Sequence, residues 1–198
     1  MLKSESVMLR PLQLPFYSRD TAVVARDLLG KSLVRKLDGE MMEGVLVETE
    51  AYYGLEDPAS RAFLGMKEYN RLMWGAPGVV FVYNVHRYWM FNIVAHEPDE
   101  VGAVLVRAVE PTVGTKLMLN NRPVDSLKDL TSGPGKLTIA FAIDKSLNGA
   151  SLTRLDGEVS ILNTDRKVEV ASSRRIGVTR DLERNLRFYA KGNPFVSR

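Results

Sequence analysis

The strongest constraint on the fold is a series of short β-rich segments joined by tight turns. They combine β-branched and aromatic residues with strand-like lengths, and they are residues 31–37, 44–52, 79–85, 88–95 and 102–110. Asp38-Gly39 follows the first segment, and only His86-Arg87 separate the third from the fourth, so both places predict β-hairpins. Strands that follow one another through hairpins pair antiparallel. The pattern therefore favours a mostly antiparallel sheet.

Helices are predicted between these strands. Residues 20–29 are expected to form one that is capped by Asp20 or Ser18, with Gly30 in a left-handed conformation after its end. The apolar side of this helix is expected to comprise Val23, Val24, Leu28 and Leu29.

Two further helices and two further strands complete the expected fold. A short helix is expected around residues 68–74, and the glycine-rich residues 132–135 introduce another that runs to about Asp144. Strands are expected near residues 159–162 and 186–190. No internal repeat or linker divides the 198 residues. We therefore expect one α+β domain over residues 1–198, with helices flanking the sheet.

Composition excludes several kinds of site and of protein. The chain has no Cys, which excludes disulfides, Cys-ligated metals and thiol nucleophiles, and its only imidazoles are His86 and His96. No apolar run is long enough to span a membrane, and Lys3 and Glu5 interrupt the N-terminus where a secretory signal would need an apolar core. We therefore expect a cytoplasmic or nuclear protein that is not secreted. The net charge of +3 is compatible with an anionic partner but does not establish one.

Two carboxylates lie within the apolar strand predicted at residues 44–52. In strict alternation, one face would carry Leu46, Glu48, Glu50 and Tyr52, and the other Val45, Val47 and Thr49. Carboxylates held against apolar surroundings acquire raised pKa values and become useful general acids or bases. The alternative is an edge strand that faces solvent and whose glutamates pair with lysines.

The turn of the predicted hairpin at residues 79–95 is unusually rich in aromatic and basic residues. Those around it are Tyr83, His86, Arg87, Tyr88 and Trp89. Aromatic faces can stack on nucleic acid bases, at roughly 1–3 kcal/mol each, while Arg can contact phosphates. The alternative is that the aromatic residues, Phe81 among them, belong to the core of the sheet.

Two cations stand at positions that require an explanation. Arg107 lies in an otherwise apolar strand, so it must be paired, either in a structural salt bridge or with a catalytic carboxylate or a ligand. Lys136 follows a glycine-rich segment that lacks the spacing of a P-loop, and it either helps to bind one phosphate or lies in an ordinary helix cap. Arg174-Arg175 and residues 180–191 could extend a phosphate-contacting surface.

Six motifs occur along the chain in one order. They are VETEAYYGLEDPAS, GxxFVY, RYWMFN, VLVRAVEP, SGPGKLTIAFAIDKS and RFYAKGNPFVS. Together they resemble the alkyladenine (3-methyladenine) DNA glycosylase family from about Leu12 to Ser197. The resemblance implies a curved antiparallel sheet with a protruding β-hairpin that enters the minor groove of double-stranded DNA. It also implies hydrolysis of the N-glycosidic bond of damaged purines, the first step of base-excision repair, without a metal or other cofactor. We expect a monomer, as for a protein that scans DNA.

The resemblance also implies roles for particular residues. Glu50 matches the general base of the family, which activates the attacking water, and Arg107 matches an arginine that positions this water. Tyr52 and Tyr83 match two aromatic walls of the base pocket, and Asn92 matches a residue that gates it. An alkylated purine carries positive charge, so it would bind favourably against these aromatic faces.

The chain departs from the family pattern at two places. Arg61 stands where the family has a pocket histidine, which bears on the substrate range. The hairpin tip lacks the intercalating tyrosine of the family, and His86 is nearest to its place, flanked by Arg87 and Tyr88.

Two alternatives to a monofunctional glycosylase follow from the same residues. A non-catalytic protein could bind damaged or single-stranded nucleic acid in the same pocket, although it would have no use for a water-activating Glu50. A bifunctional glycosylase and lyase would need a desolvated lysine, and Lys136 is the only candidate linked to a motif.

Overall fold

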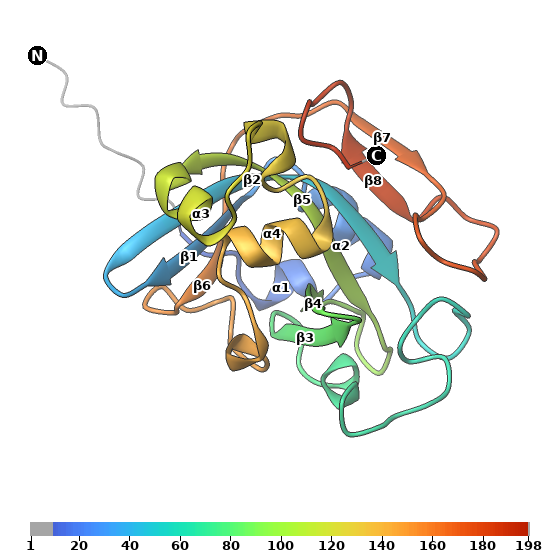
Figure 1. Cartoon of the computed structure of the whole chain (residues 1–198). Helices are drawn as coiled ribbons and strands as arrows, with labels where there is room; N and C mark the ends of the chain where they lie inside the picture. The colour runs from blue at the N-terminus through green and yellow to red at the C-terminus, as the bar shows by residue number, and fades with distance from the viewer. Residues whose placement is uncertain (1–9, 198) are drawn as a thin grey trace, which may run out of the picture.

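A curved antiparallel sheet forms the frame of the molecule (Figure 1). The computed structural model describes residues 10–197, so Lys3 and Glu5, on which the expectation of no secretory signal depends, lie outside the described residues. The strands are β1 (Ser32–Leu37), β2 (Glu40–Tyr52), β3 (Val80–Val85), β4 (Tyr88–Val94), β5 (Ala103–Val113), β6 (Val159–Leu162), β7 (Val170–Ser173) and β8 (Arg187–Ala190). Their order is β3-β4-β5-β2-β1-β6, with β8 between β2 and β7. The expected α+β class is confirmed.

Strand β2 connects the two halves of the sheet. On one edge it pairs with β5 along most of its length, and on the other it pairs first with β1 and then, over Glu48–Glu50, with β8. The hairpin predicted between β1 and β2 is present, with Asp38 and Gly39 both left-handed at φ 50° and 82°. This arrangement places the carboxylates of β2 in the middle of the sheet.

The strict side-chain alternation predicted for residues 45–52 is wrong, because the β2–β5 ladder contains bulges. The pairing skips Val47 on β2 and Arg107 on β5. A bulge inserts an extra residue and re-aims the side chains that follow it. Leu46 therefore packs in the main hydrophobic core instead of sharing the face of Glu48. The buried Thr49 also points toward the helices, and its hydroxyl donates a hydrogen bond to a main-chain carbonyl of α2. Both carboxylates keep a common face, on which Val47 also lies.

The helices are short. They are α1 (Leu14–Tyr17), α2 (Thr21–Asp27), α3 (Thr115–Asn121) and α4 (Pro134–Ala140), with 3₁₀ helices at Arg71–Trp74, Leu127–Asp129 and Lys145–Leu147. Helix α2 begins as predicted, since the Asp20 carboxylate accepts a hydrogen bond from the Val23 amide at 3.0 Å, and Gly30 is left-handed. It ends at Asp27, earlier than predicted. Val23 is 43% exposed and does not lie on the apolar side.

The remaining differences concern the length and number of elements. The helix predicted around residues 68–74 is a 3₁₀ turn at Arg71–Trp74. The helix that starts at Pro134 ends at Ala140 rather than near Asp144, because the chain turns through a left-handed Ala142. Helices α1 and α3 and strand β7 had no counterpart in the sequence prediction.

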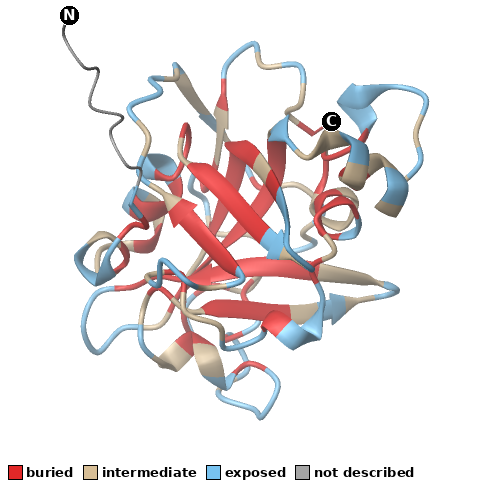
Figure 2. Cartoon of the chain, turned by 90° about the vertical axis from the view of Figure 1, so that its left-hand side faces the viewer, coloured by how far each residue is buried: buried red, intermediate tan, exposed pale blue. Residues whose placement is uncertain are grey.

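The main core lies between the sheet and the helices. Side chains of α2 and α4 pack in it together with inward-facing residues of β2, β4 and β5. Figure 2 shows the buried strands running through the middle of the molecule, while the exposed segments are mostly loops and turns around them. None of the helices within residues 10–197 is both long and apolar enough to cross a membrane.

Candidate active site

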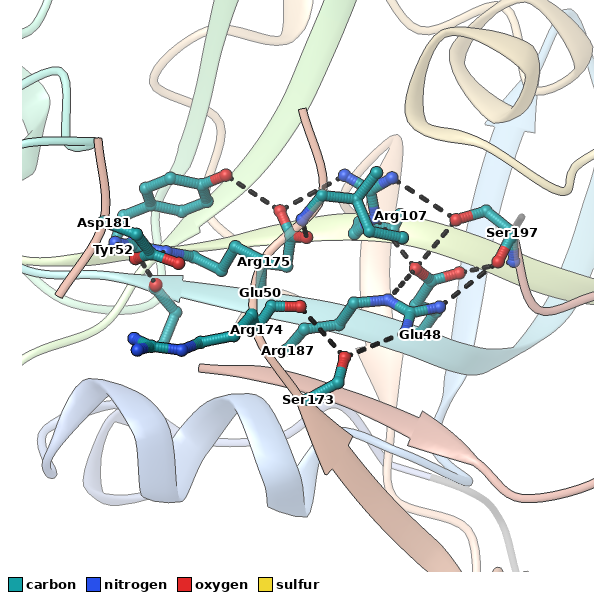
Figure 3. A network of polar contacts seen from close by, with 12 residues as sticks. Glu48, Glu50, Tyr52, Arg107, Ser173, Arg174, Arg175, Asp181, Arg187 and Ser197 are labelled. Atoms are coloured by element: carbon teal, nitrogen blue, oxygen red, sulfur yellow. Dashed lines mark hydrogen bonds and ion pairs between the residues drawn. The ribbon is translucent and has the colours of Figure 1, made fainter. Parts of the chain in front are cut away.

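Glu48 is fully buried and accepts four hydrogen bonds (Figure 3). Its Oε1 accepts hydrogen bonds from Arg107 Nε at 2.8 Å, Arg187 Nε at 2.7 Å and Ser197 Oγ at 2.8 Å, and its Oε2 accepts one from the Ser197 amide at 2.6 Å. A carboxylate offers about four acceptor positions. Glu48 therefore holds two arginines and the C-terminal segment in place, and the prediction of a solvent-facing strand paired with lysines is wrong.

Glu50 is also fully buried but receives fewer hydrogen bonds. The Tyr52 hydroxyl donates to its Oε2 at 2.8 Å, Arg107 Nη1 donates to the same oxygen at 3.2 Å, and the Ile176 amide donates to Oε1 at 2.8 Å. One acceptor position of the carboxylate remains, which is enough to bind a water molecule.

Arg107 is paired, as its place in an apolar strand requires, and it connects the two carboxylates. It pairs with Glu48 and Glu50, and its Nη2 donates to the Ser197 hydroxyl at 3.3 Å. Burial disfavours the charged guanidinium, but Glu50 and Glu48 outweigh this effect and raise the pKa of Arg107. The cation is therefore permanent, as a buried charge with two anionic partners is expected to be.

A cavity of about 460 Å³ lies next to this ion-pair network. Its lining residues are Tyr52, Pro58, Ala59, Arg61, Tyr83, Val85, Met90, Leu105, Arg107, Pro134, Ile176, Gly177, Val178, Thr179 and Arg180. We call it the tyrosine cavity. All three hydrogen-bond donors to Glu50 belong to residues of its lining, so this carboxylate lies directly behind the cavity wall.

The two tyrosines of the cavity remain neutral well above physiological pH. Burial raises the pKa of Tyr52, and the hydrogen bond to the negative Glu50 raises it further. Burial likewise raises the pKa of Tyr83, although the nearby Arg61 opposes this effect. Neutral phenol rings provide apolar faces for a flat ligand.

Arg61 and Asn92 occupy different positions relative to the tyrosine cavity. Arg61 is exposed and lines it, with its Cζ 4.8 Å from the centroid of the Tyr83 ring. Asn92 is buried on β4 and is the cross-strand partner of Leu105 on β5, which on its other side is the partner of Glu50 on β2. Its amide donates to main-chain carbonyls of β3 and β4, so it lies behind the lining rather than in it.

The predicted hairpin of β3 and β4 is present and turns at His86-Arg87. His86 is exposed in a left-handed conformation, with φ 52°, and Arg87 is exposed beside it. Tyr88 instead packs against α4, so closely that a Cβ atom at Gly135 would lie 2.9 Å from Tyr88 Cγ. The tip of the hairpin therefore consists of His86 and Arg87.

The expectation that the hairpin aromatics belong to the core is correct for three of them. Phe81 is fully buried in a hydrophobic cluster that Tyr83 also contacts. Trp89 is partly buried and packs against the main core.

Lys136 lies outside the tyrosine cavity, in a second cavity of about 500 Å³ that shares Arg107 and Pro134 with it. The Lys136 ammonium lies 3.2 Å from Asp129 Oδ1, and Lys128 and Ser132 also line this second cavity. A lysine so placed lies near the network but does not contact Glu50.

Sequence reasoning did not assign three residues to the network. Arg187 and Ser197 hold Glu48, and Arg175 lies under Tyr52 with its guanidinium carbon 4.5 Å from the ring centroid. The expectation that Arg175 and Arg187 could extend a phosphate-contacting surface is wrong, because the side chain of Arg175 is completely buried between Asp57 and Asp181, and Arg187 is buried and pairs with Glu48. No local pattern marks these residues, since their partners lie far away in the sequence.

Comparison with known proteins adds an independent finding. A family model described as "Methylpurine-DNA glycosylase (MPG)" matches residues 15–194. Proteins named "Putative 3-methyladenine DNA glycosylase" are similar over nearly the whole chain. The protein from Aeropyrum pernix is 42% identical, covering 96% of this chain and 94% of its own. Those from Mesorhizobium japonicum and Carboxydothermus hydrogenoformans are 43% and 39% identical, covering 90% and 96% of this chain and 86% and 100% of their own.

Proposed function

The chain belongs to the methylpurine-DNA glycosylase family, and on this basis we propose that it is a monofunctional enzyme for damaged purines in double-stranded DNA. As a DNA glycosylase it is a hydrolase of N-glycosidic bonds. We propose that residues 1–198 act as a single catalytic domain, and that base release begins base-excision repair.

The substrate base must leave the duplex before it can react, because its glycosidic bond is unreachable inside the stack. Extrusion costs a few kcal/mol, and least for damaged bases that pair poorly. The tyrosine cavity supports this step, since it offers two neutral aromatic walls in about 460 Å³. Alkylation at N3 or N7 gives a purine positive charge, which favours contact with the faces of Tyr52 and Tyr83.

Glu50 is proposed as the general base. A water molecule bound to its remaining acceptor position would attack the anomeric carbon, while the glycosidic bond breaks and its electron pair leaves with the base. Glu50 takes the proton of the water, and the products are a free base and an abasic site. The negative carboxylate also stabilises the positive charge that develops on the sugar.

The observation that carries this assignment is the difference between the two glutamates. Glu48 receives four hydrogen bonds, three of them from Arg187 and Ser197, which do not line the cavity, whereas Glu50 receives three, all from residues that line it. Arg107 bridges them, so Glu48 orients the arginine and the arginine orients Glu50.

The test uses duplexes that each carry one alkylated or deaminated purine. Wild-type protein should release the base and leave an alkali-labile site, and Glu50→Gln should lose activity beyond the ~10²–10⁴-fold typical of a general base, because cation stabilisation is lost as well. Lesion binding should persist in this variant. Glu48→Gln is the matched control, and it should keep measurable base release. Normal turnover of Glu50→Gln with an inactive Glu48→Gln would assign the base to Glu48.

Two outcomes of the same assay would replace the proposal. Lesion binding by the wild-type protein without base release would identify a binding protein. A covalent enzyme–DNA adduct trapped with borohydride would identify a lyase. We expect no adduct, because Lys136 pairs with Asp129 and lies outside the tyrosine cavity.

A further inference from the structure

The segment that connects β7 to β8 supplies one wall of the tyrosine cavity and one hydrogen bond to Glu50. It comprises residues 174–186 and contains neither helix nor strand. Five of its residues line the cavity, namely Ile176, Gly177, Val178, Thr179 and Arg180. The Ile176 amide donates to Glu50 Oε1 at 2.8 Å. Residues 175–181 take part in no main-chain hydrogen bond with one another or with the rest of the described residues, 10–197. Side-chain contacts must therefore hold the Ile176 amide against Glu50.

The Arg175 side chain makes these contacts. Its Nη1 donates to the Ala51 carbonyl at 2.9 Å, and its two terminal nitrogens donate to the Asp57 carboxylate at 2.6 and 2.7 Å. Its Nε donates to Asp181 Oδ1 at 2.9 Å. The guanidinium carbon lies 4.5 Å from the centroid of the Tyr52 ring (Figure 3). One side chain therefore joins β2, the segment that follows it, and both ends of the stretch that carries the Ile176 amide.

The partners of Arg175 belong to three different walls of the tyrosine cavity. Asp57 directly precedes the lining residues at positions 58 and 59, and its carboxylate also accepts a main-chain amide of this wall at 3.1 Å. Tyr52 is the second wall, and residues 174–186 supply the third. Arg175 itself does not line the cavity. It therefore fixes the walls from behind.

The anchor depends on the shape of the guanidinium as well as on its charge. Burial disfavours the charge on Arg175, but its hydrogen bonds to Asp57 and Asp181 outweigh this effect and raise its pKa. A planar guanidinium donates in several fixed directions at once, whereas the ammonium of a lysine is a compact point charge. A lysine at this position would keep the charge and lose most of the links.

We propose that Arg175 is a positioning residue of the active site, which holds the Ile176 amide on Glu50 and thereby keeps this carboxylate directed at the cavity. The inference rests on the proposed function and adds a residue to its machinery. Arg175 touches neither the base nor the attacking water. It acts on the rate of base release more than on the binding of the lesion, because a misplacement of about 1 Å can cost about 10²-fold in rate.

Arg175→Lys is the most informative variant. Its ammonium can still pair with Asp57, but it cannot also reach the Ala51 carbonyl and Asp181 in the geometry of the guanidinium. Arg35→Lys is the matched control, since Arg35 is also buried, donates to a main-chain carbonyl and pairs with a carboxylate, but lies on β1 and does not line the cavity.

Asp181→Ala is a milder variant that takes the place of Arg175→Lys if the lysine variant does not fold. It removes one partner of Arg175 and leaves Asp57 and the Ala51 carbonyl in place. It should change the rate in the same direction and to a smaller extent.

The first measurement compares rate with affinity on a duplex that carries one 7-methylguanine. Affinity is measured on the same duplex with a 2′-fluoro sugar, which resists hydrolysis because fluorine destabilises the positive charge that develops on the sugar. Arg175→Lys should lower the single-turnover rate about 10- to 100-fold and the affinity much less, and Arg35→Lys should change neither. An unchanged rate would overturn the proposal. Equal losses of rate and affinity would also overturn it, because they would show that Arg175 only supports the walls.

A second measurement separates this inference from the proposed function. Hydrogen exchange of the Ile176 amide, followed by NMR, needs no hydrolysis, and an amide held in a hydrogen bond exchanges slowly. Arg175→Lys should accelerate this exchange, and Arg35→Lys should not. Acceleration would support the anchoring of Ile176 even if no base were released from DNA, and the proposed function alone would then fail. Unchanged exchange would overturn the inference even if the protein were an active glycosylase.

Discussion

Glu48 and Glu50 are chemically identical and lie two positions apart, yet their surroundings give them different capacities. Glu48 is shared by two arginines and the C-terminal segment, whereas Glu50 faces residues that line a cavity. The different roles proposed for the two carboxylates therefore follow from the groups that surround each of them rather than from the carboxylates themselves.

Of the two glutamine variants, Glu50→Gln should be the less active, whereas Glu48→Gln should be the less stable. Glu48→Gln leaves Arg107 and Arg187 buried without their common anion, and breaking a buried pair typically costs about 3–5 kcal/mol. Glu50→Gln should cost less, because Arg107 keeps Glu48. Urea denaturation of both variants measures the free energies of unfolding. A larger loss for Glu50→Gln would mean that the network is organised around Glu50 instead.

Arg61 should restrict the substrate range of the tyrosine cavity. Its guanidinium lies on Tyr83 at the cavity, where it repels a base that is already positive. Arg61→His should therefore raise excision of 7-methylguanine relative to hypoxanthine in single-turnover assays. An unchanged ratio would indicate that Arg61 turns away from the base in the DNA complex and contacts a phosphate.

Sequence predicted the residues of the site that lie on one strand better than those that meet by tertiary contact. Alternation places Glu50 and Tyr52 on the same face, which the hydrogen bond between them confirms. It assigns Leu46 wrongly, because a bulge leaves no trace in a pattern of apolar residues. Arg175 hydrogen-bonds the Ala51 carbonyl, which is 124 residues away in the sequence, and Ser197 hydrogen-bonds Glu48, which is 149 residues away. Only the folded chain brings these residues together.

Elements that carry strong local signals were predicted, and those that depend on neighbours were not. The hairpins at Asp38-Gly39 and His86-Arg87 follow from turn chemistry and flanking strands. Within residues 10–197, strand β7 pairs only with β8, and helix α3 follows β5 after a single glycine, so neither has a pattern of its own. Helix α4 is shorter than predicted because its end is determined by the backbone at Ala142.

The β3–β4 hairpin should supply the side chain that fills the space left by an extruded base. Tyr88 is held against α4, which leaves the exposed imidazole of His86 at the tip. His86→Ala should weaken lesion-specific binding by roughly 1–3 kcal/mol, the value of one base–aromatic stack. Fluorescence of 2-aminopurine next to the lesion should report reduced unstacking. Non-specific binding and its salt dependence should change little, since phosphate contacts determine them.

Two control variants separate the His86 ring from the turn. His86→Asn removes the ring but keeps a residue that tolerates positive φ, so it should lose the fluorescence signal as His86→Ala does. Tyr88→Ala should retain the signal. If only Tyr88→Ala lost it, Tyr88 would be the inserted side chain and the hairpin would have to rearrange on DNA.

At the scale of the whole molecule, a buried tyrosine should limit stability in alkaline solution. Tyr17 is completely buried in the main core, and its hydroxyl has no hydrogen-bond partner among residues 10–197. Burial raises its pKa far above the ordinary 10.0. Above pH 10.0 the unfolded chain therefore loses the proton of Tyr17 while the folded chain keeps it. Because the folded state then binds more protons, the free energy of unfolding falls as pH rises.

Tyr17→Phe should remove this penalty without loss at neutral pH. An unsatisfied buried hydroxyl costs about 1–3 kcal/mol, so the variant should be as stable as wild type or more stable. Its stability should also fall less steeply above pH 10.0, although Tyr52 and Tyr83 keep part of the dependence, since burial raises the pKa of both. Tyr53→Phe is the control, because its hydroxyl donates to Asp20 at 2.8 Å and its loss should destabilise. Urea denaturation at neutral pH and above pH 10.0 measures the free energies of unfolding of these variants. If Tyr17→Phe were less stable than wild type at neutral pH, the Tyr17 hydroxyl would have a hydrogen-bond partner in solution.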